Sequence, residues 1–74
     1  MLKIGDRVVI KTWDEIKRTC KIKNMDDGYD INNFYISNDM LECLGSDGII
    51  LAINTEYSAY QIGDWWYTAD MLKY

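Results

Sequence analysis

The sequence predicts a single, mainly β domain over residues 1–74, folded as a small, closed or nearly closed barrel of about five short strands. Almost half of the residues (49%) are apolar and 14% are aromatic, which is too apolar for a disordered chain. The apolar residues fall in short segments separated by turns. Since the chain has no Pro, these turns must be made by Gly, Asp and Asn. A closed barrel also protects edge strands that carry few charges.

The clearest strand signal lies in residues 5–13, GDRVVIKTW. Val8 and Ile10 alternate with their neighbours, which is the two-residue period of a half-buried strand. The β-branched residues favour that conformation. Gly5 and Asp6 supply the turn that opens the strand.

The next twenty residues are less regular. Trp13, Ile16 and Cys20 fall at helical spacing within residues 13–23, so one or two helical turns are expected there. The polar segment 24–33, NMDDGYDINN, is predicted to form a long loop with its tip at the Asp-Gly pair.

A short extended piece at residues 34–37 leads to a predicted short helix. Asp39 and Glu42 have the spacing of a capping box, and Gly45 follows where such a helix would end. These signals predict a strand, one or two helical turns and then a turn of the chain.

Three further strands follow in the second half. The apolar run IILAI at residues 49–53 predicts a strand buried on both faces. Residues 57–62 alternate between apolar and polar side chains, and WWYT at residues 65–68 forms the next aromatic strand. Thr68 is expected to cap a final helical turn.

Two segments resemble each other, FYISNDML at residues 34–41 and WWYTADML at residues 65–72. Each is an aromatic strand end, a hydroxyl residue, an Asp and then Met-Leu. Two copies are too few for a repeat protein, so we interpret them as one local solution used twice. The predicted core contains Val8, Ile10, Met40, Leu44, Ile50, Ala52, Tyr60, Ile62, Met71 and Leu72.

The composition argues against an enzyme. The chain has no His, which removes the commonest general base and metal ligand. Cys20 and Cys43 have no metal-ligand spacing, and we interpret them as reduced thiols, although a disulfide between them stays open. No catalytic residue, metal site or cofactor is predicted. With no signal peptide pattern and no long apolar run, a cytoplasmic protein without a membrane partner is expected.

The net charge of −4 is unevenly distributed. Residues 1–23 hold seven of the eight basic side chains and three acidic ones, whereas residues 24–74 hold nine acidic side chains and only Lys73. The second part of the chain therefore carries a charge of −8. It either belongs to an ordinary solvated surface or forms an acidic face that attracts a basic partner.

Binding of a protein partner is the function that we expect. Aromatic side chains bury much area at low entropic cost, and acidic side chains increase the rate of association with a basic surface. The candidate partner-binding residues are Tyr57, Tyr60, Trp65, Trp66 and Tyr67, together with Asp26, Asp27, Asp30 and Asp64.

Two alternatives stay open. Trp13 is expected to share a strand face with Arg7 and Lys11, so it could stack a base while the cations hold phosphates of a nucleotide or single-stranded nucleic acid. The overall negative charge opposes that interpretation. An exposed patch of Trp and Tyr could also be the interface of a homodimer.

Three segments carry a resemblance to a known group of proteins. KIGDRVVIKTW, LGSDGII and YQIGDWWYTADML, in this order, resemble small SH3-like barrel proteins of phages and their bacterial hosts, over about half of the chain. Residues 17–33 have no counterpart in that resemblance. It implies an SH3-like barrel that acts as a binding module. Some phage proteins of this size are similar in being stoichiometric inhibitors of host defence, including anti-CRISPR proteins, which implies an anti-defence inhibitor.

Overall fold

The structure is a computed structural model that describes residues 2–74. The chain is mainly β, with one α-helix and two short 3-10 helices among the strands. In chain order, the elements are β1 (Arg7–Ile10), α1 (Trp13–Thr19), β2 (Ile22–Met25), β3 (Gly28–Ile31), β4 (Phe34–Ser37), η1 (Asn38–Cys43), β5 (Asp47–Asn54), β6 (Ala59–Ile62), β7 (Trp65–Thr68), η2 (Ala69–Met71) and β8 (Leu72–Lys73).

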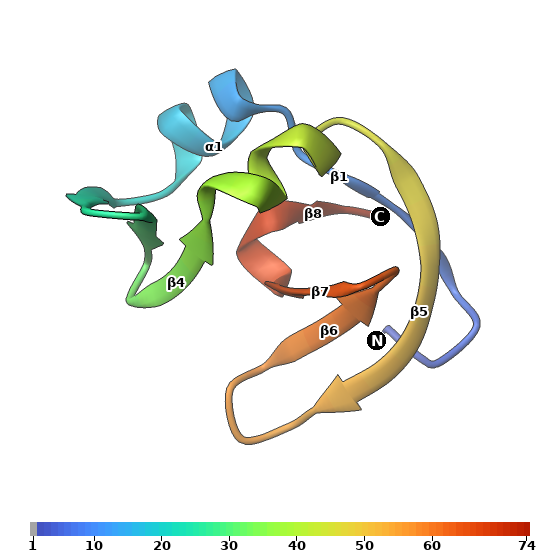
Figure 1. The fold of residues 1–74 in the computed structure, drawn as a ribbon. Coiled ribbons are helices and arrows are strands. Elements are labelled where there is room, and N and C mark those ends of the chain that lie inside the picture. Colours follow the sequence, from blue (N-terminus) through green and yellow to red (C-terminus); the bar gives the residue numbers. More distant parts are fainter. Residues whose placement is uncertain (1) are drawn as a thin grey trace.

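The strands form two antiparallel sheets. A five-stranded sheet has the order β7-β6-β5-β1-β8, and a three-stranded sheet has the order β2-β3-β4. Figure 1 shows β5 curving around one side of the molecule, with the three-stranded sheet at the opposite end. A register shift between Ile50 and Ala52 interrupts the pairing of β5 with β6, which is where a bulge allows a strand to bend.

One core serves both sheets. It contains the predicted residues Val8, Ile10, Met40, Ile50, Ile62, Met71 and Leu72, which confirms most of the predicted core. Ala52, Tyr60 and Leu44 are only half-buried. The core also takes in Ile16 from α1, Ile31 and Ile36 from the three-stranded sheet, and Tyr67 from β7. The two sheets and α1 are therefore packed together as one unit.

The helix α1 confirms the helical spacing of residues 13–23, and its start has a full capping box. The Thr12 side chain accepts a hydrogen bond from the Glu15 backbone, and the Glu15 side chain accepts one from the Thr12 backbone. Ile16 is the buried residue of this helix. No helix in residues 2–74 is long and apolar enough to cross a membrane.

The prediction of a long loop over residues 24–33 is wrong. These residues belong to the hairpin β2–β3, in which Met25 pairs with Gly28 across a tight turn and Ile22 pairs with Ile31. Tyr29 and Ile31 alternate with polar residues in β3, but β2 contains no buried residue, so the hairpin gives only a weak strand signal. Composition favoured a loop because the hairpin has only one buried face.

Two finer predictions are also wrong. The first 3-10 helix starts after Ser37, and not at Asp39, and no side chain caps it. β5 is not buried on both faces, because Ile49 is 45% exposed and Leu51 is 55% exposed. Thr68 does stand at the cap position of η2, but without a side-chain hydrogen bond to that helix.

In the structure, the similarity between residues 34–41 and 65–72 also includes the strand that precedes each segment, β3 and β6. Gly28 pairs with Ser37 in the first hairpin, and the residues 31 positions later, Ala59 and Thr68, pair in the second. The three remaining residue pairs of β3–β4 also have counterparts in β6–β7, again 31 positions later. Each hairpin is followed by a 3-10 helix. We call residues 28–41 the first module and residues 59–72 the second module.

Candidate binding groove

An open groove of about 570 Å³ lies at the start of β5, beside the turn between β6 and β7. Its apolar lining includes Ile49, Leu51 and Trp65, and its polar lining includes Arg7, Asp47 and Asp64. Ile49 and Leu51 are among the most exposed large apolar side chains of the protein. The groove therefore offers apolar contact area that the fold itself does not use.

Two glycines shape this groove. A side chain at Gly48 would stand 2.5 Å from the Ile62 side chain, so only glycine lets β5 and β6 approach this closely. Gly63 has a φ of 64°, which permits the tight turn that leads into Trp65. The local sequence thus positions Trp65 at the groove while keeping the strands close together.

The charges of the groove are unequal. Arg7 and Asp47 form an ion pair of 2.7 Å, with both side chains more than half exposed. Asp64 forms no ion pair with any residue of the described chain. The groove therefore carries one surplus negative charge, which would attract a cationic ligand and repel a phosphate.

The Tyr67 side chain lies under the groove and is completely buried. Burial raises the pKa of Tyr67 above its usual range, and the neighbouring Cys43 thiol adds to the shift. The thiol lies close to the hydroxyl, but the geometry gives the hydroxyl no hydrogen-bond partner within residues 2–74. A neutral and unsatisfied hydroxyl is thus buried beside the groove.

The predicted aromatic patch is only partly assembled. Trp65 and Asp64 line the groove, but Tyr67 is buried in the free protein and is not part of an exposed patch there, which corrects that prediction. Trp66 is half-buried and points away from Trp65, because neighbouring residues of a strand face opposite sides. Tyr60 packs against the core, and Tyr57 is 62% exposed in the β5–β6 connection.

The predicted acidic loop lies elsewhere. Asp26 and Asp27 are exposed in the turn of the β2–β3 hairpin, which Figure 1 shows in dark green at the end of the molecule opposite β5. Asp30 lies within β3, half-buried, in register with Lys23 and Tyr35. The acidic loop and the groove therefore do not form one continuous site.

The predicted nucleic-acid face is not assembled. Trp13 begins α1 and does not share a strand with Arg7, which lies at the groove. The Trp13 ring centroid lies 4.8 Å from that of Tyr29, and the Lys17 ammonium lies 5.9 Å from the Trp13 ring centroid. Lys11 donates a hydrogen bond to Thr19 at 3.2 Å. Trp13 and Lys11 thus contact neighbours within the protein, and Arg7 lies apart from them at the groove.

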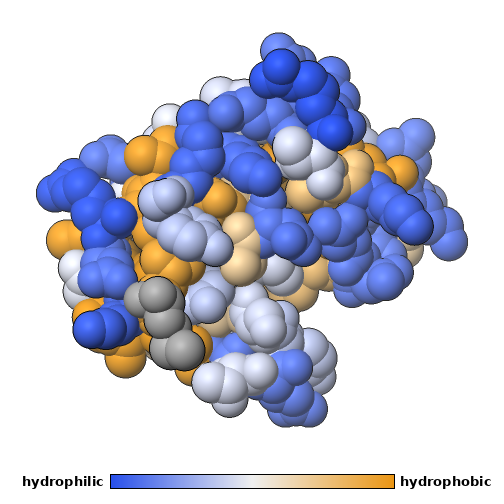
Figure 2. Space-filling model, turned by 180° about the vertical axis from the view of Figure 1, so that it is seen from behind, coloured by the Kyte–Doolittle hydropathy of each residue, from blue (hydrophilic) through white to orange (hydrophobic). Residues whose placement is uncertain are grey.

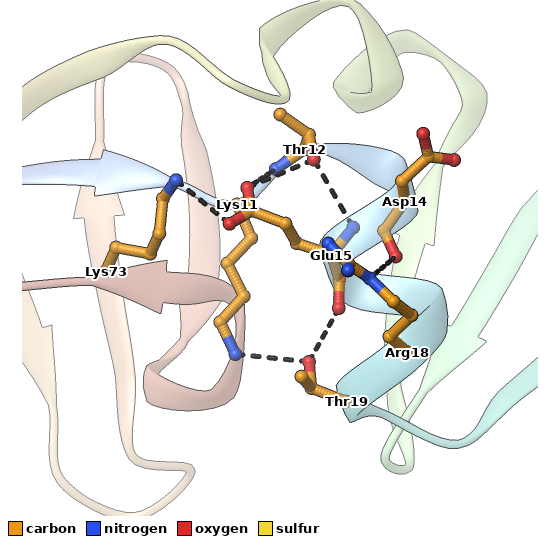
Figure 3. A network of polar contacts seen from close by, with 7 residues as sticks. All are labelled: Lys11, Thr12, Asp14, Glu15, Arg18, Thr19 and Lys73. Atoms are coloured by element: carbon orange, nitrogen blue, oxygen red, sulfur yellow. Dashed lines mark hydrogen bonds and ion pairs between the residues drawn. The ribbon is translucent and has the colours of Figure 1, made fainter.

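The densest polar network surrounds Glu15 and supports the fold (Figure 3). Its carboxylate accepts hydrogen bonds from Thr12 and forms an ion pair of 3.0 Å with Lys73 of β8. The hydrogen bond from the Thr12 backbone and the Lys73 ammonium lower the pKa of Glu15 to about 2. A carboxylate held in this way is ionised at neutral pH. It completes the cap of α1 through Thr12 and connects α1 to the last strand through Lys73.

Sequence reasoning missed Ile49, Leu51 and Cys43 as parts of the groove. The apolar run of β5 predicts burial on both faces, but the strand exposes Ile49 and Leu51 on one of them. On the side opposite to that of Figure 1, hydrophobic side chains gather on one side and hydrophilic ones cover most of the remainder (Figure 2). Exposed apolar area of this kind is typical of an interaction surface.

The lining of the groove is suited to binding. It offers apolar walls, one surplus carboxylate and one buried hydroxyl. In the part of the chain from residue 2 to residue 74, no three Cys, Asp or Glu side chains gather in a way that could hold a metal ion. Comparisons of the chain with protein-family models, with curated proteins and with solved structures find no match.

Proposed function

We propose that this protein is a non-enzymatic binding protein that binds a protein partner stoichiometrically through the groove between β5 and the β6–β7 turn. The observation that supports this function is the exposure of Ile49 and Leu51 beside Trp65. These side chains supply apolar contact area around a defined hollow, which is the composition of a binding site. The surplus charge of Asp64 favours a partner with a basic contact surface.

The fold that we propose for the five-stranded sheet is an SH3-like barrel. β1, β5, β6 and β7 follow one another across the sheet, and β8 returns to pair with β1 after the 3-10 helix η2. This connectivity is the one expected of such a barrel. The three segments that resemble SH3-like phage proteins all overlap this sheet, and residues 17–33, which have no counterpart, lie in α1, β2, β3 and their connections. The three-stranded sheet is then an insertion between the first two barrel strands.

The resemblance gives the proposed role its context. In a phage or mobile element, a small acidic module of this kind would act as a stoichiometric inhibitor of a host-defence protein in the bacterial cytoplasm. A basic nucleic-acid-binding enzyme is a suitable target, because carboxylates can occupy positions that phosphates would take. Asp64 at the groove supports such a mode more directly than the distant Asp26 and Asp27.

Affinity capture from bacterial lysate tests this function, with and without nuclease treatment and with recovery read by mass spectrometry. The test compares the native chain with Leu51→Ser in the groove and with Tyr35→Ser as a matched control, because Tyr35 is 47% exposed on the other sheet. We expect one protein in near-equal amount with the native chain and with Tyr35→Ser, and much less with Leu51→Ser.

Three results would contradict the proposal. Recovery that depends on nucleic acid would move the function to the alternative of nucleic-acid binding. Equal recovery by Leu51→Ser would place the binding site outside the groove. Sedimentation that shows a stable dimer, which Leu51→Ser disrupts, would mean that the groove serves self-association.

A further inference from the structure

The buried hydroxyl of Tyr67 has no explanation in the fold. It is completely buried and forms no hydrogen bond within residues 2–74, so it lowers the stability of the free protein. A phenylalanine would fill the same volume without this cost. Tyr67 borders the groove, and a bound molecule could provide the missing partner if the side chains that cover the hydroxyl move on binding.

The groove offers hydrogen-bond acceptors to a cation. The Tyr67 hydroxyl is neutral and can accept a hydrogen bond through its oxygen, and the Asp64 carboxylate is an acceptor without an ion-pair partner in the described chain. Arg7 does not fill this role, because its guanidinium is already paired with Asp47. Within residues 2–74, no donor of the groove forms a hydrogen bond with either of these two acceptors.

The remaining lining selects among cations. The Trp65 indole, Ile49 and Leu51 all line the groove. A guanidinium stacks on an aromatic face and donates in several directions, whereas an ammonium is a compact and strongly hydrated charge. An arginine also carries an aliphatic stem that apolar walls can cover.

We propose that the groove receives an arginine side chain of the protein partner, with the guanidinium stacked on Trp65 and paired with Asp64, and that the lining shifts on binding so that the guanidinium also donates a hydrogen bond to the Tyr67 hydroxyl, which is inaccessible in the free protein. This inference rests on the proposed function and names the feature of the partner that the groove recognises. It assigns the buried hydroxyl a role that exists only in the complex. The free protein is then less stable than a variant with phenylalanine at position 67 would be, and the hydroxyl is retained because it contacts the partner.

A set of short peptides tests this site directly. The probes are acetyl-Gly-Arg-Gly-amide and its counterparts with lysine, citrulline or norleucine in place of arginine, titrated to about 10 mM because single side chains bind weakly. Two-dimensional NMR of the full chain follows the indole N–H of Trp65 and the amides of Asp64 and Tyr67. We expect saturable shifts with the arginine peptide, weaker ones with lysine, and none with citrulline or norleucine.

Variants locate the contacts. Tyr67→Phe and Asp64→Asn should each weaken the arginine peptide roughly tenfold, because each removes a hydrogen bond to a charged group. The matched controls are Tyr60→Phe and Asp30→Asn, which remove the same groups outside the groove and should leave the affinity unchanged. Tyr67→Phe should also raise the thermal midpoint of the free protein, which shows that the variant is folded.

The outcomes separate this inference from the function on which it rests. A higher midpoint for Tyr67→Phe with unchanged peptide affinity would overturn the role of the hydroxyl. Equal binding of citrulline, or no shifts with arginine at about 10 mM, would overturn the guanidinium site. If these results occurred while Leu51→Ser still abolished capture of the partner, the proposed function would stand and only the arginine site would fall.

Discussion

The two modules have the same strand register but lie in different sheets. The first module, residues 28–41, pairs with β2 in the three-stranded sheet, and the second, residues 59–72, pairs with β5 in the five-stranded sheet. They share identical residues at five corresponding positions, Tyr29 and Tyr60, Ile31 and Ile62, Asp39 and Asp70, Met40 and Met71, and Leu41 and Leu72. The local sequence therefore determines the hairpin and its 3-10 helix, and the strand that pairs with the module determines which sheet it joins.

The difference is sharpest at one position of the second strand. Ile36 in the first module and Tyr67 in the second are both completely buried, but only Tyr67 carries a polar group. Beside it, Trp65 replaces Phe34 and lines the groove. The same strand register thus holds a buried apolar residue in one module and a groove-lining face in the other, although the turns differ, because Asn32 and Asn33 both have a positive φ and of the second turn only Gly63 does.

The largest effect is expected from exchanging the small residues that begin the two modules. Gly28 and Ala59 are both buried, but an added Cβ at Gly28 would clash with the backbone carbonyl of Ile36. Gly28→Ala should therefore reduce the free energy of unfolding by about 3 kcal/mol, because backbone must move. Ala59→Gly should cost about 1 kcal/mol through chain entropy. Urea unfolding followed by Trp fluorescence measures both.

This pair of variants tests how similar the modules are. If Gly28→Ala reduced the free energy of unfolding no more than Ala59→Gly does, the first hairpin could accommodate a side chain at this position as the second does. The close approach of β3 to β4 would then not distinguish the two modules. A matched control is Gly5→Ala, because nothing lies within 4 Å of a side chain there. Its φ of 95° makes any loss of stability a backbone effect alone.

An effect of intermediate size on the free energy of unfolding is expected from pH, and it arises only at the end of the second module. Lys73 follows that module and pairs with Glu15, whereas the corresponding residue after the first module is Glu42, which forms no ion pair among the described residues. The pKa of Glu15 is lowered from 4.5 to about 2 by its Thr12 and Lys73 contacts. The folded state thus binds this proton less readily than the unfolded state, so its contribution to stability is full above about pH 5 and is lost as the pH falls towards 2.

Thermal unfolding at several pH values measures this contribution. The midpoint of the native chain should fall further between pH 5 and pH 2 than that of Glu15→Gln, which has no carboxylate to protonate. Glu42→Gln is the control and should follow the native chain. An equal pH dependence in all three proteins would mean that the ties of α1 to β8 do not depend on the charge of Glu15.

The sequence predicted the parts of the fold that have a one-dimensional signature. The strand at Val8 and Ile10, the helical spacing of Trp13 and Ile16, and the recurrence of Met-Leu all correspond to observed elements. The β2–β3 hairpin escaped because its polar face and turn dominate the composition. The groove was only partly predictable, since Trp65 and Asp64 were identified but the exposure of Ile49 and Leu51 depends on which strands flank β5.

The smallest effect is expected at the start of the two 3-10 helices, and there the modules should behave alike. The hydroxyls of Ser37 and Thr68 are both buried without a hydrogen-bond partner in residues 2–74. Neither one caps the helix that follows it. Loss of a hydroxyl that caps a helix costs about 1 kcal/mol, whereas loss of an unsatisfied buried one is neutral or stabilising by up to about 1 kcal/mol. Ser37→Ala and Thr68→Val should therefore be at least as stable as the native chain.

Thr12→Ala provides the contrast, because the Thr12 side chain does cap α1. It should lose about 1 kcal/mol in the same urea unfolding experiment. If Thr68→Val were destabilised as much as Thr12→Ala while Ser37→Ala was not, the second module would contain a polar contact that the first lacks. The two modules would then differ in their local structure and not only in the strands that flank them.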